Sequence, residues 1–191
     1  MTSPAGDSPR VFQQLDRATY PYTLREYARR FLWRVVEATA IRFSPPRAHG
    51  WRRFWLRLFG GKIGPHSSIR PSTRIFHPWL LEMGDWSVLA DDVIVYNLGP
   101  VTIGDHSVVS QGASLCAGTL DYTQPNFPLQ RPPIRIGSGV WIAAQAFIGP
   151  GVSVGNNTVV GARAVVAKDL PPDSVVGGNP ARVLKPRRMA D

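Results

Sequence analysis

A six-residue repeat of aliphatic side chains runs from residue 136 to residue 171 and restricts the folds open to this chain. Its members are Ile136, Ile142, Ile148, Val154, Val160 and Val166. The period matches neither the turn of a helix nor the two-residue alternation of a strand. It is typical of a parallel β-helix, in which each hexapeptide forms one short face and its aliphatic side chain points into the coil. We expect the glycines beside these positions to allow positive φ and close backbone approach: Gly137, Gly149, Gly155 and Gly161.

The same frame extends backwards when two-residue slips are allowed at the corners. Three faces of six residues close one coil of about 18 residues. The earlier aliphatic positions are Ile63, Ile69, Ile75, Met83, Leu89, Val95, Ile103, Val109 and Leu115. The sequence therefore predicts an all-β core over residues 61–171, a parallel β-helix of about five coils.

Composition indicates one domain inside the cell. A length of 191 residues suits a single domain with a sizeable core. The single cysteine, Cys116, excludes an internal disulfide framework and is compatible with a reducing compartment. No apolar run approaches a membrane span of roughly 18 residues, and the N-terminus lacks the core of a signal peptide. We therefore expect a cytoplasmic protein.

Two helices are expected before the repeat. Residues 1–22 have no sustained period and are interpreted as a flexible arm, whereas residues 23–60 are interpreted as a helical cap. The first helix begins with a capping box of Thr23 and Glu26. The second covers residues 51–59 and stops at a pair of glycines.

The helical cap is strongly basic. Residues 24–60 contain nine Arg and two Glu, a local charge of +7 within the chain total of +9. Such a segment suits peripheral contact with an anionic membrane or an acidic partner. The interpretation that we favour is a solvated basic face on helices that close the open end of the coil or pack on a neighbouring subunit. Nucleic acid is not expected, because the basic and aromatic residues fall on helix-core spacing and the coil has no basic stripe.

The repeat is interrupted once by an excursion. Residues 121–135 lie outside the frame and contain four prolines. Long loops on a compact repeat are usually functional, and prolines stiffen them, which favours an ordered wall beside a cleft over a neutral insertion. Residues 172–191 follow the last coil and are interpreted as a C-terminal tail.

From residue 95 onwards the sequence resembles a known family. The runs that carry the resemblance are VYNLGPVTIG, SQGASLCAGTLDYTQPNFPL, IRIGSGVWIAAQAFIGPGVSVG, VVGARAVVAKDLPP and GGNPARVLK, and HGWRRFWLRLFGGKIG extends it into the cap. They are similar to hexapeptide-repeat acyltransferases, most of all to colanic-acid-type polysaccharide acetyltransferases, which are related to galactoside acetyltransferase. The resemblance implies a left-handed β-helix, a homotrimer, active sites in clefts between neighbouring coils, and acetyl-CoA as donor without a metal.

The resemblance also implies site residues. The positions that match coenzyme A contacts are Trp141, Ala143, Ala144, Ala162, Ala167, Lys168 and Arg182. Asn97 matches the position near the acceptor hydroxyl, although an Asn at a corner is often only a turn former. Trp141 could equally be an interface aromatic, and Lys168 and Arg182 could equally be surface charge.

Leu120 departs from the family pattern. The segment GTLDY has leucine where the family usually has a histidine that acts as general base on the acceptor hydroxyl. Asp121 is adjacent but is a poorly matched base for an alcohol. His77 is predicted two coils away from Leu120, beyond direct proton transfer, and a lone Cys116 in a packed coil is usually inert.

Three functions are compatible with the sequence. The first is an acetyl-CoA-dependent O-acetyltransferase of a sugar or lipid-linked saccharide in exopolysaccharide synthesis, either impaired by Leu120 or using a substitute base. The second is a non-catalytic hexapeptide-repeat scaffold that still binds coenzyme A. The third is a zinc enzyme, which would need three converging histidines. The candidates are His66, His77 and His106, and their spacing is not convincing.

Overall fold

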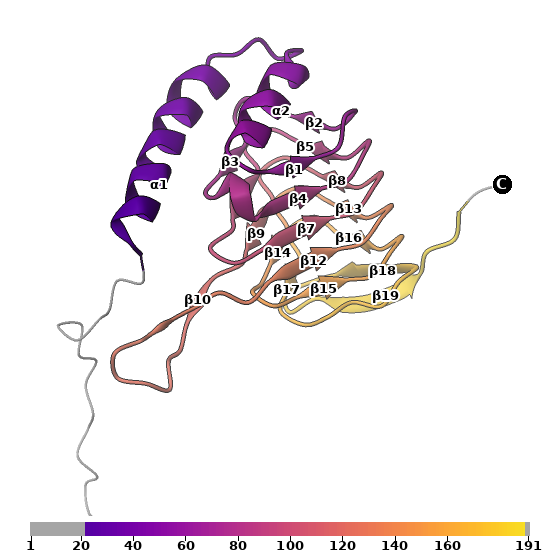
Figure 1. Cartoon of the computed structure of the whole chain (residues 1–191). Helices are drawn as coiled ribbons and strands as arrows, with labels where there is room; N and C mark the ends of the chain where they lie inside the picture. Colours follow the sequence, from indigo (N-terminus) through magenta and orange to yellow (C-terminus); the bar gives the residue numbers. More distant parts are fainter. Residues whose placement is uncertain (1–21, 190–191) are drawn as a thin grey trace, which may run out of the picture.

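The structure of the chain is a three-sided solenoid of short strands with helices at one end (Figure 1). This computed structural model describes residues 22–189, so the arm predicted for residues 1–22 lies outside the described residues except for Tyr22. The predicted fold class, a parallel β-solenoid with an N-terminal helical cap, is confirmed.

Residues 22–189 form four helical elements and a series of two- to five-residue strands. The helical elements are α1 (Leu24–Val36), the π-helical η2 (Glu37–Ile41), α2 (His49–Leu58) and the 3-10 turn η3 (Pro78–Leu80). The first strands are β1 (Lys62–Ile63), β2 (Ser68–Ile69), β3 (Arg74–Ile75), β4 (Leu81–Met83), β5 (Val88–Leu89), β6 (Ile94–Tyr96), β7 (Val101–Ile103), β8 (Val108–Val109) and β9 (Ser114–Cys116). The others are β10 (Thr119–Leu120), β11 (Leu129–Gln130), β12 (Ile134–Ile136), β13 (Trp141–Ile142), β14 (Phe147–Ile148), β15 (Ser153–Val154), β16 (Val159–Val160), β17 (Val165–Val166), β18 (Ser174–Gly177) and β19 (Arg182–Pro186).

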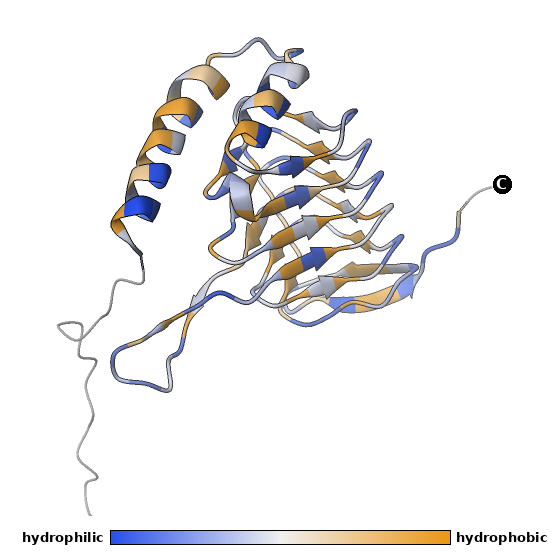
Figure 2. Ribbon diagram, viewed as in Figure 1, coloured by the Kyte–Doolittle hydropathy of each residue, from blue (hydrophilic) through white to orange (hydrophobic). Residues whose placement is uncertain are grey.

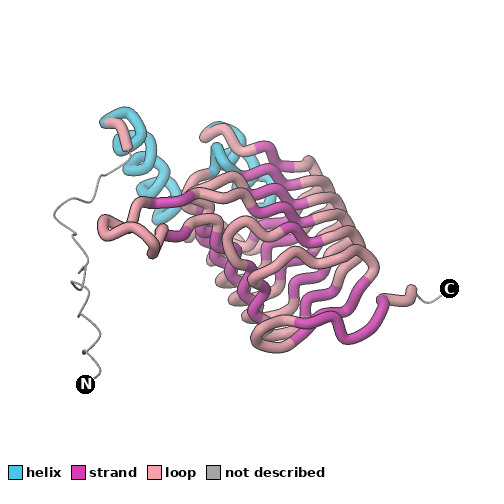
Figure 3. The backbone as a smooth tube through the Cα atoms, turned by 90° about the horizontal axis from the view of Figure 1, so that it is seen from below, coloured by secondary structure: helices cyan, strands magenta, loops and turns pink. Residues whose placement is uncertain are grey.

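Three parallel sheets run along the solenoid, and Figure 3 shows them from below. Sheet A has the order β1, β4, β7, β12, β15. Sheet B has the order β2, β5, β8, β13, β16, β18, and sheet C the order β3, β6, β9, β14, β17. The chain passes from A to B to C in each turn, so each turn has three edges: AB, BC and CA.

The aliphatic frame read from the sequence is the core of the solenoid. In sheet A, Ile63, Met83, Ile103, Ile136 and Val154 occupy one register, one turn apart. The equivalent rows in sheets B and C start at Ile69 and Ile75. Every side chain of the three rows is at most 6% exposed. Each turn thus buries its aliphatic side chains against the next, which a single hexapeptide could not do alone.

The solenoid continues beyond the predicted end at residue 171. Within residues 22–189, five turns contribute a strand to each sheet. A bridge between Val154 and Leu170 then leads into β18, which begins an incomplete sixth turn in sheet B. β19 pairs antiparallel with β18. The segment interpreted as a tail is therefore largely a hairpin that closes this end of the molecule. The left-handed sense of the coil stays a prediction from the family resemblance.

The four glycines beside the aliphatic positions serve close approach rather than positive φ. A Cβ at Gly155 would lie 2.7 Å from the Cα of Pro172 in the next turn, and a Cβ at Gly137 would lie 2.8 Å from the backbone nitrogen of Asn156. Positive φ occurs instead at corner residues such as His106 (53°) and Asn157 (56°). Of the two reasons expected for these glycines, only close approach applies.

The arginines of the cap bind the uncovered edge of the first turn. In the described part of the chain, strands β1, β2 and β3 have no turn above them, so their carbonyl groups need other donors. Arg57 Nε donates to Ile63 O (3.0 Å), Arg53 Nη1 to Ser67 O (2.8 Å) and Arg52 Nε to Ile69 O (2.5 Å). Trp33 of α1 completes the row by donating from Nε1 to Ile75 O (2.6 Å). These contacts favour the interpretation of the basic cap as a closure of the coil.

Candidate active site

The excursion after Leu120 is a hairpin that projects from edge CA (Figure 1). β10 and β11 pair antiparallel with Leu120 opposite Leu129, and the connection turns at Phe127, where φ is 46°. Its return strand runs close to the second turn, because a Cβ at Gly99 would lie 2.8 Å from the carbonyl carbon of Arg131. The excursion thus has the defined secondary structure that a cleft wall requires.

Leu120 lies on this hairpin and is accessible. Its side chain is 48% exposed. A leucine side chain has no atom that can accept a proton, so an acceptor hydroxyl placed here meets no base from this residue. The nearby thiol of Cys116 is partly buried and donates to Gly118 O (3.4 Å).

Asp121 follows Leu120 and is occupied by its own loop. Its carboxylate accepts from Thr123 Oγ1 (2.6 Å), from the Thr123 backbone N–H (3.0 Å) and from Gln124 Nε2 (2.8 Å). These bonds hold the pKa of Asp121 below its ordinary value, and the bond from the Thr123 hydroxyl has the largest effect. A carboxylate of lowered pKa is an even weaker base for an alcohol than a free one. The geometry therefore assigns Asp121 to the turn.

Asn97 is fully buried at edge CA of the second turn. Its Nδ2 donates to His77 O (2.6 Å), and its Oδ1 accepts from the His77 backbone N–H (2.9 Å). Both atoms of the amide are thus bonded to the turn above, the arrangement expected of a turn former. A role toward the acceptor stays a prediction.

His77 is the residue bonded to Asn97 and is 3% exposed. Its Nδ1 lies 2.8 Å from Asn97 O, and a carbonyl can only accept, so this nitrogen carries the proton. Burial lowers the pKa of His77, and the charges of Arg30 and Arg131 act in the same direction. His77 is therefore an enclosed imidazole whose Nδ1–H is bonded to the backbone of Asn97.

Three of the residues matched to coenzyme A lie at edge BC. Ala143 and Ala144 follow β13, and Ala162 follows β16 one turn later; the Arg163 N–H donates to Ala144 O (2.9 Å) and links the two turns. Ala144 is partly buried and Ala162 is exposed, so these two small side chains form a strip along the edge, flanked by the longer side chains of Gln145 and Arg163. Trp141 stands beside it on sheet B, 49% exposed, and donates from Nε1 to Ser110 Oγ (2.9 Å).

The remaining matched residues lie at the end of the solenoid. Arg182 begins β19, and the neighbouring Ala181 N–H donates to Val165 O (2.9 Å), which brings it to the last strand of sheet C. Ala167 and Lys168 are exposed, but they follow β17 and therefore lie at edge CA. The structure thus separates these two from the other matched residues.

Two different edges therefore carry the two halves of the predicted site. Asn97, Leu120 and Asp121 connect sheet C to sheet A, whereas Ala144 and Ala162 connect sheet B to sheet C. Sheet C lies between the two groups in every turn. Within one copy of the chain, Asn97, Leu120 and Asp121 therefore lie apart from Ala144 and Ala162.

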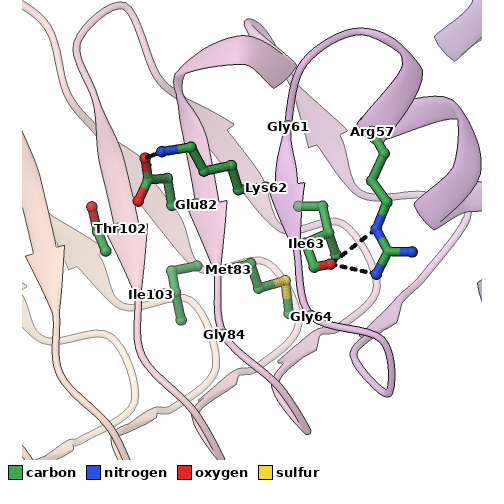
Figure 4. A pocket seen from close by; sticks show the side chains of 10 residues that line it. All are labelled: Arg57, Gly61, Lys62, Ile63, Gly64, Glu82, Met83, Gly84, Thr102 and Ile103. Atoms are coloured by element: carbon green, nitrogen blue, oxygen red, sulfur yellow. Dashed lines mark hydrogen bonds and ion pairs between the residues drawn. The ribbon is translucent and has the colours of Figure 1, made fainter.

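A hollow of about 530 Å³ on sheet A contains none of the predicted site residues (Figure 4). In it Lys62 pairs with Glu82 (2.5 Å), and Arg57 is bonded to Ile63 O. Across residues 22–189, no three His, Cys, Asp or Glu side chains converge as ligands for a metal. His66 instead pairs with Asp85 (2.7 Å) and stacks on Trp86.

Sequence reasoning missed Ser110 and Gln145. Ser110 orients the Trp141 indole, and Gln145 Oε1 accepts from Arg163 Nε (2.7 Å) at edge BC. The frame contained the signal for Ser110, because Val109 and Ile142 share a register, which puts residue 110 one turn above residue 143.

Comparison with known proteins agrees with this architecture. Residues 133–168 match the bacterial transferase hexapeptide family, described by six repeats. A protein named as a colanic acid biosynthesis acetyltransferase, WcaF of Escherichia coli (strain K12), is 48% identical over 156 residues, which cover 82% of this chain and 86% of that protein. The crystal structure of a Vibrio cholerae hexapeptide-repeat acetyltransferase in complex with acetyl coenzyme A has a TM-score of 0.78 at 27% identity, covering 87% of this chain and 91% of the other.

The hexapeptide solenoid, with its family match over residues 133–168, has the architecture of the class of hexapeptide-repeat transferases. The chain belongs to the hexapeptide-repeat acetyltransferase family and is a relative of WcaF. Galactoside O-acetyltransferase of Escherichia coli (strain K12) is a further relative, 38% identical over 88 residues, which cover 44% of this chain and 43% of that protein.

Proposed function

We propose that the chain is an acetyl-CoA-dependent O-acetyltransferase that acts on a sugar hydroxyl in polysaccharide biosynthesis in the cytoplasm. The observation that carries the proposal is the 48% identity to WcaF over 82% of the chain. The acceptor we favour is a saccharide, free or lipid-linked.

The strip of small side chains at edge BC supports binding of the donor. An extended pantetheine arm needs a surface without bulky side chains, and Ala144 and Ala162 provide one over two consecutive turns. In the proposal Trp141, Ala143, Ala144 and Ala162 hold the arm, and Arg182 meets a phosphate. Lys168 and Ala167 lie at edge CA and in this proposal contact a donor bound by a neighbouring subunit.

The separation of the two edges supports a homotrimer as part of the proposal. If edge CA of one subunit faces edge BC of the next, a closed ring of three copies forms three equivalent sites. The exposed indole of Trp141 and the projecting hairpin at residues 119–130 are suited to lie across such an interface.

The reaction has one unmet requirement in this chain. When the acceptor oxygen attacks the thioester carbonyl, a C–O bond forms, the C–S bond breaks, and the hydroxyl proton must pass to a base while the leaving thiolate gains a proton. Leu120 supplies no base, Asp121 has a lowered pKa, and His77 is enclosed. We infer that positioning of the substrates is retained and that proton removal is slow.

The experiment that tests the proposal is the substitution Leu120→His. Acetyl transfer to a panel of sugars should rise at least about tenfold, with a pH profile that rises near the ordinary histidine pKa of about 6.5. Leu120→Gln is the control, because it adds polarity without a base. A fully active parent that Leu120→His leaves unchanged would mean that another residue supplies the base.

A non-catalytic scaffold is the second candidate. It is favoured by the occupied amide of Asn97 and by Leu120 itself. It predicts that acetyl-CoA binds in calorimetry while parent and Leu120→His both remain inert with every acceptor. An acetyl-CoA-binding protein that gains activity on Leu120→His rejects this candidate.

A further inference from the structure

Both cap helices carry their apolar faces on the outside. In α1, the side that meets the solenoid carries Trp33, and Leu24, Phe31 and Val35 lie about half a helical turn away from it. These three side chains are 89%, 68% and 46% exposed. A surface helix of a globular protein normally buries its apolar stripe and turns its charged residues to water. In α1 this order is reversed.

The second helix repeats the reversal. Arg52 and Leu56 of α2 are buried toward the first turn, whereas Trp51, Phe54 and Leu58 are 47%, 53% and 62% exposed. Figure 2 shows hydrophobic stretches on the ribbons of both helices. Of the seventeen large hydrophobic side chains exposed within the described residues, nine lie between Leu24 and Leu58. We call the exposed residues Leu24, Phe31, Val35, Phe43, Trp51, Phe54 and Leu58 the cap face.

The charges around the cap face have one sign. Arg25, Arg42 and Arg47 are exposed, and within the described part of the chain their guanidinium groups form no ion pair. The two carboxylates of this segment are occupied elsewhere. Glu26 caps α1 through Thr23, and Glu37 accepts from the Ile75 N–H (2.8 Å) on the solenoid side.

We propose that the cap face is a docking surface for an anionic lipid bilayer. Aromatic and aliphatic side chains with a rim of free arginines and no free carboxylate form the combination that lies in the interface of such a membrane. No helix among residues 22–189 is long and apolar enough to cross the bilayer. The contact is therefore with the membrane surface.

The same features disfavour a second copy as the occupant. A symmetric pair would place the rim of Arg25, Arg42 and Arg47 opposite an identical rim, and like charges across an interface are unfavourable. The start of α1 lies close to edge CA, where the Arg131 guanidinium covers the Tyr22 ring (4.7 Å), so the oligomeric state of the cap-face variants is measured as part of the test.

Vesicle flotation tests the docking surface directly. The full chain should float with vesicles of phosphatidylcholine containing about one third phosphatidylglycerol, and more weakly with phosphatidylcholine alone, because each arginine near an anionic surface adds about fivefold in affinity. The triple substitution Leu24→Ser, Phe31→Ser, Val35→Ser should weaken partitioning at least about tenfold, since burial of one such side chain exceeds that factor. Arg25→Gln, Arg42→Gln, Arg47→Gln should remove the preference for the anionic vesicles.

Matched controls exist at the other end of the molecule. Val183→Ser, Leu184→Ser, Met189→Ser changes three side chains that are 52%, 67% and 71% exposed and should leave partitioning unchanged. Arg135→Gln, Lys185→Gln, Arg188→Gln is the equivalent charge control. A parent protein that floats with neither vesicle overturns the proposal. The proposal is also overturned if a cap-face variant keeps the circular dichroism of the parent but sediments as a smaller oligomer, because the cap face would then be an interface between copies of the chain.

Discussion

At the scale of single residues, Arg52 has the most demanding environment in the cap. Its side chain is fully buried, and its guanidinium donates to Ile69 O, Ser44 Oγ, Pro45 O and Pro46 O at 2.5 to 2.8 Å. A planar fork with five donors fits this set of acceptors, whereas the single ammonium of lysine does not. The residue thus joins the cap to the first turn through its shape as well as its charge.

Arg52→Lys should lower the free energy of unfolding by about 3 kcal/mol, because several buried carbonyl groups lose charged donors. Urea unfolding followed by circular dichroism measures the change. Arg47→Lys, an exposed arginine of the same segment, is the matched control and should change stability by less than about 0.5 kcal/mol. Equal effects of the two substitutions would contradict the role given to Arg52.

Glu37 gives a stability effect that depends on pH. Burial raises its pKa from the ordinary 4.5, although the bond from Ile75 N–H and the charges of Arg34 and Arg74 oppose this. Because the folded state then binds the proton more tightly than the unfolded state, stability falls as pH rises from about 4.5 to the folded pKa, and is constant above it. Urea unfolding measured from about pH 4.5 to pH 7 gives the free energy of unfolding at each pH. For Glu37→Gln this free energy should no longer fall with rising pH, and near pH 7 it should be at least as large as that of the parent. Glu82→Gln is the control, because Glu82 is exposed and paired with Lys62. A Glu37→Gln protein that is clearly less stable than the parent near pH 7 would contradict the raised pKa of Glu37.

At the scale of elements, the solenoid was predictable because its signal is local and repeated. Each aliphatic position packs on its own equivalent one turn away, so Ile136 and Val154 report the same environment and the period appears directly in the sequence. The cap helices were predictable for a similar reason, since the capping box of Thr23 and Glu26 is visible in four residues.

The site and the end of the molecule were less predictable, because their contacts are not periodic. Beyond Pro171 the frame stops, and β19 pairs antiparallel with β18, a contact that no six-residue spacing encodes. Lys168 and Ala162 lie on different edges of the solenoid, and this could be predicted only by assigning each residue to an edge of its turn. The sequence also did not predict that the cap arginines point toward the solenoid. An amphipathic helix has an apolar and a charged face, but its sequence does not show which of the two is buried.

The β18–β19 hairpin has a testable role as an edge cover. Truncation after Gly177 removes β19 and leaves one side of β18 without a partner strand, and such edges promote aggregation. We expect the shortened protein to aggregate at concentrations at which the parent stays dispersed, measured by light scattering. Truncation after Arg187 keeps β19 and should behave like the parent. If both truncated proteins stay dispersed, β19 does not protect this edge.

At the scale of the whole molecule, the proposed catalysis is a property of an assembly, because the two halves of the predicted site lie on different edges. The hairpin that carries Leu120 and the strip that carries Ala162 belong to different sides of one prism. The proposal therefore requires that each site takes Leu120 from one subunit and the coenzyme strip from its neighbour.

Mixed trimers test this arrangement. One chain carries both Leu120→His and Ala162→Trp, so it supplies the base but its own coenzyme strip is blocked. The other chain is the parent, which has an open strip but lacks the base. After co-refolding in equal amounts, about one quarter of the sites should combine a histidine with an open strip, since each contribution comes from the suitable chain with a probability of about one half. Acetyl transfer should then reach about one quarter of that of the Leu120→His homotrimer, although neither chain alone approaches it. A mixture that shows only the average of the two separate activities would place the whole site within one chain.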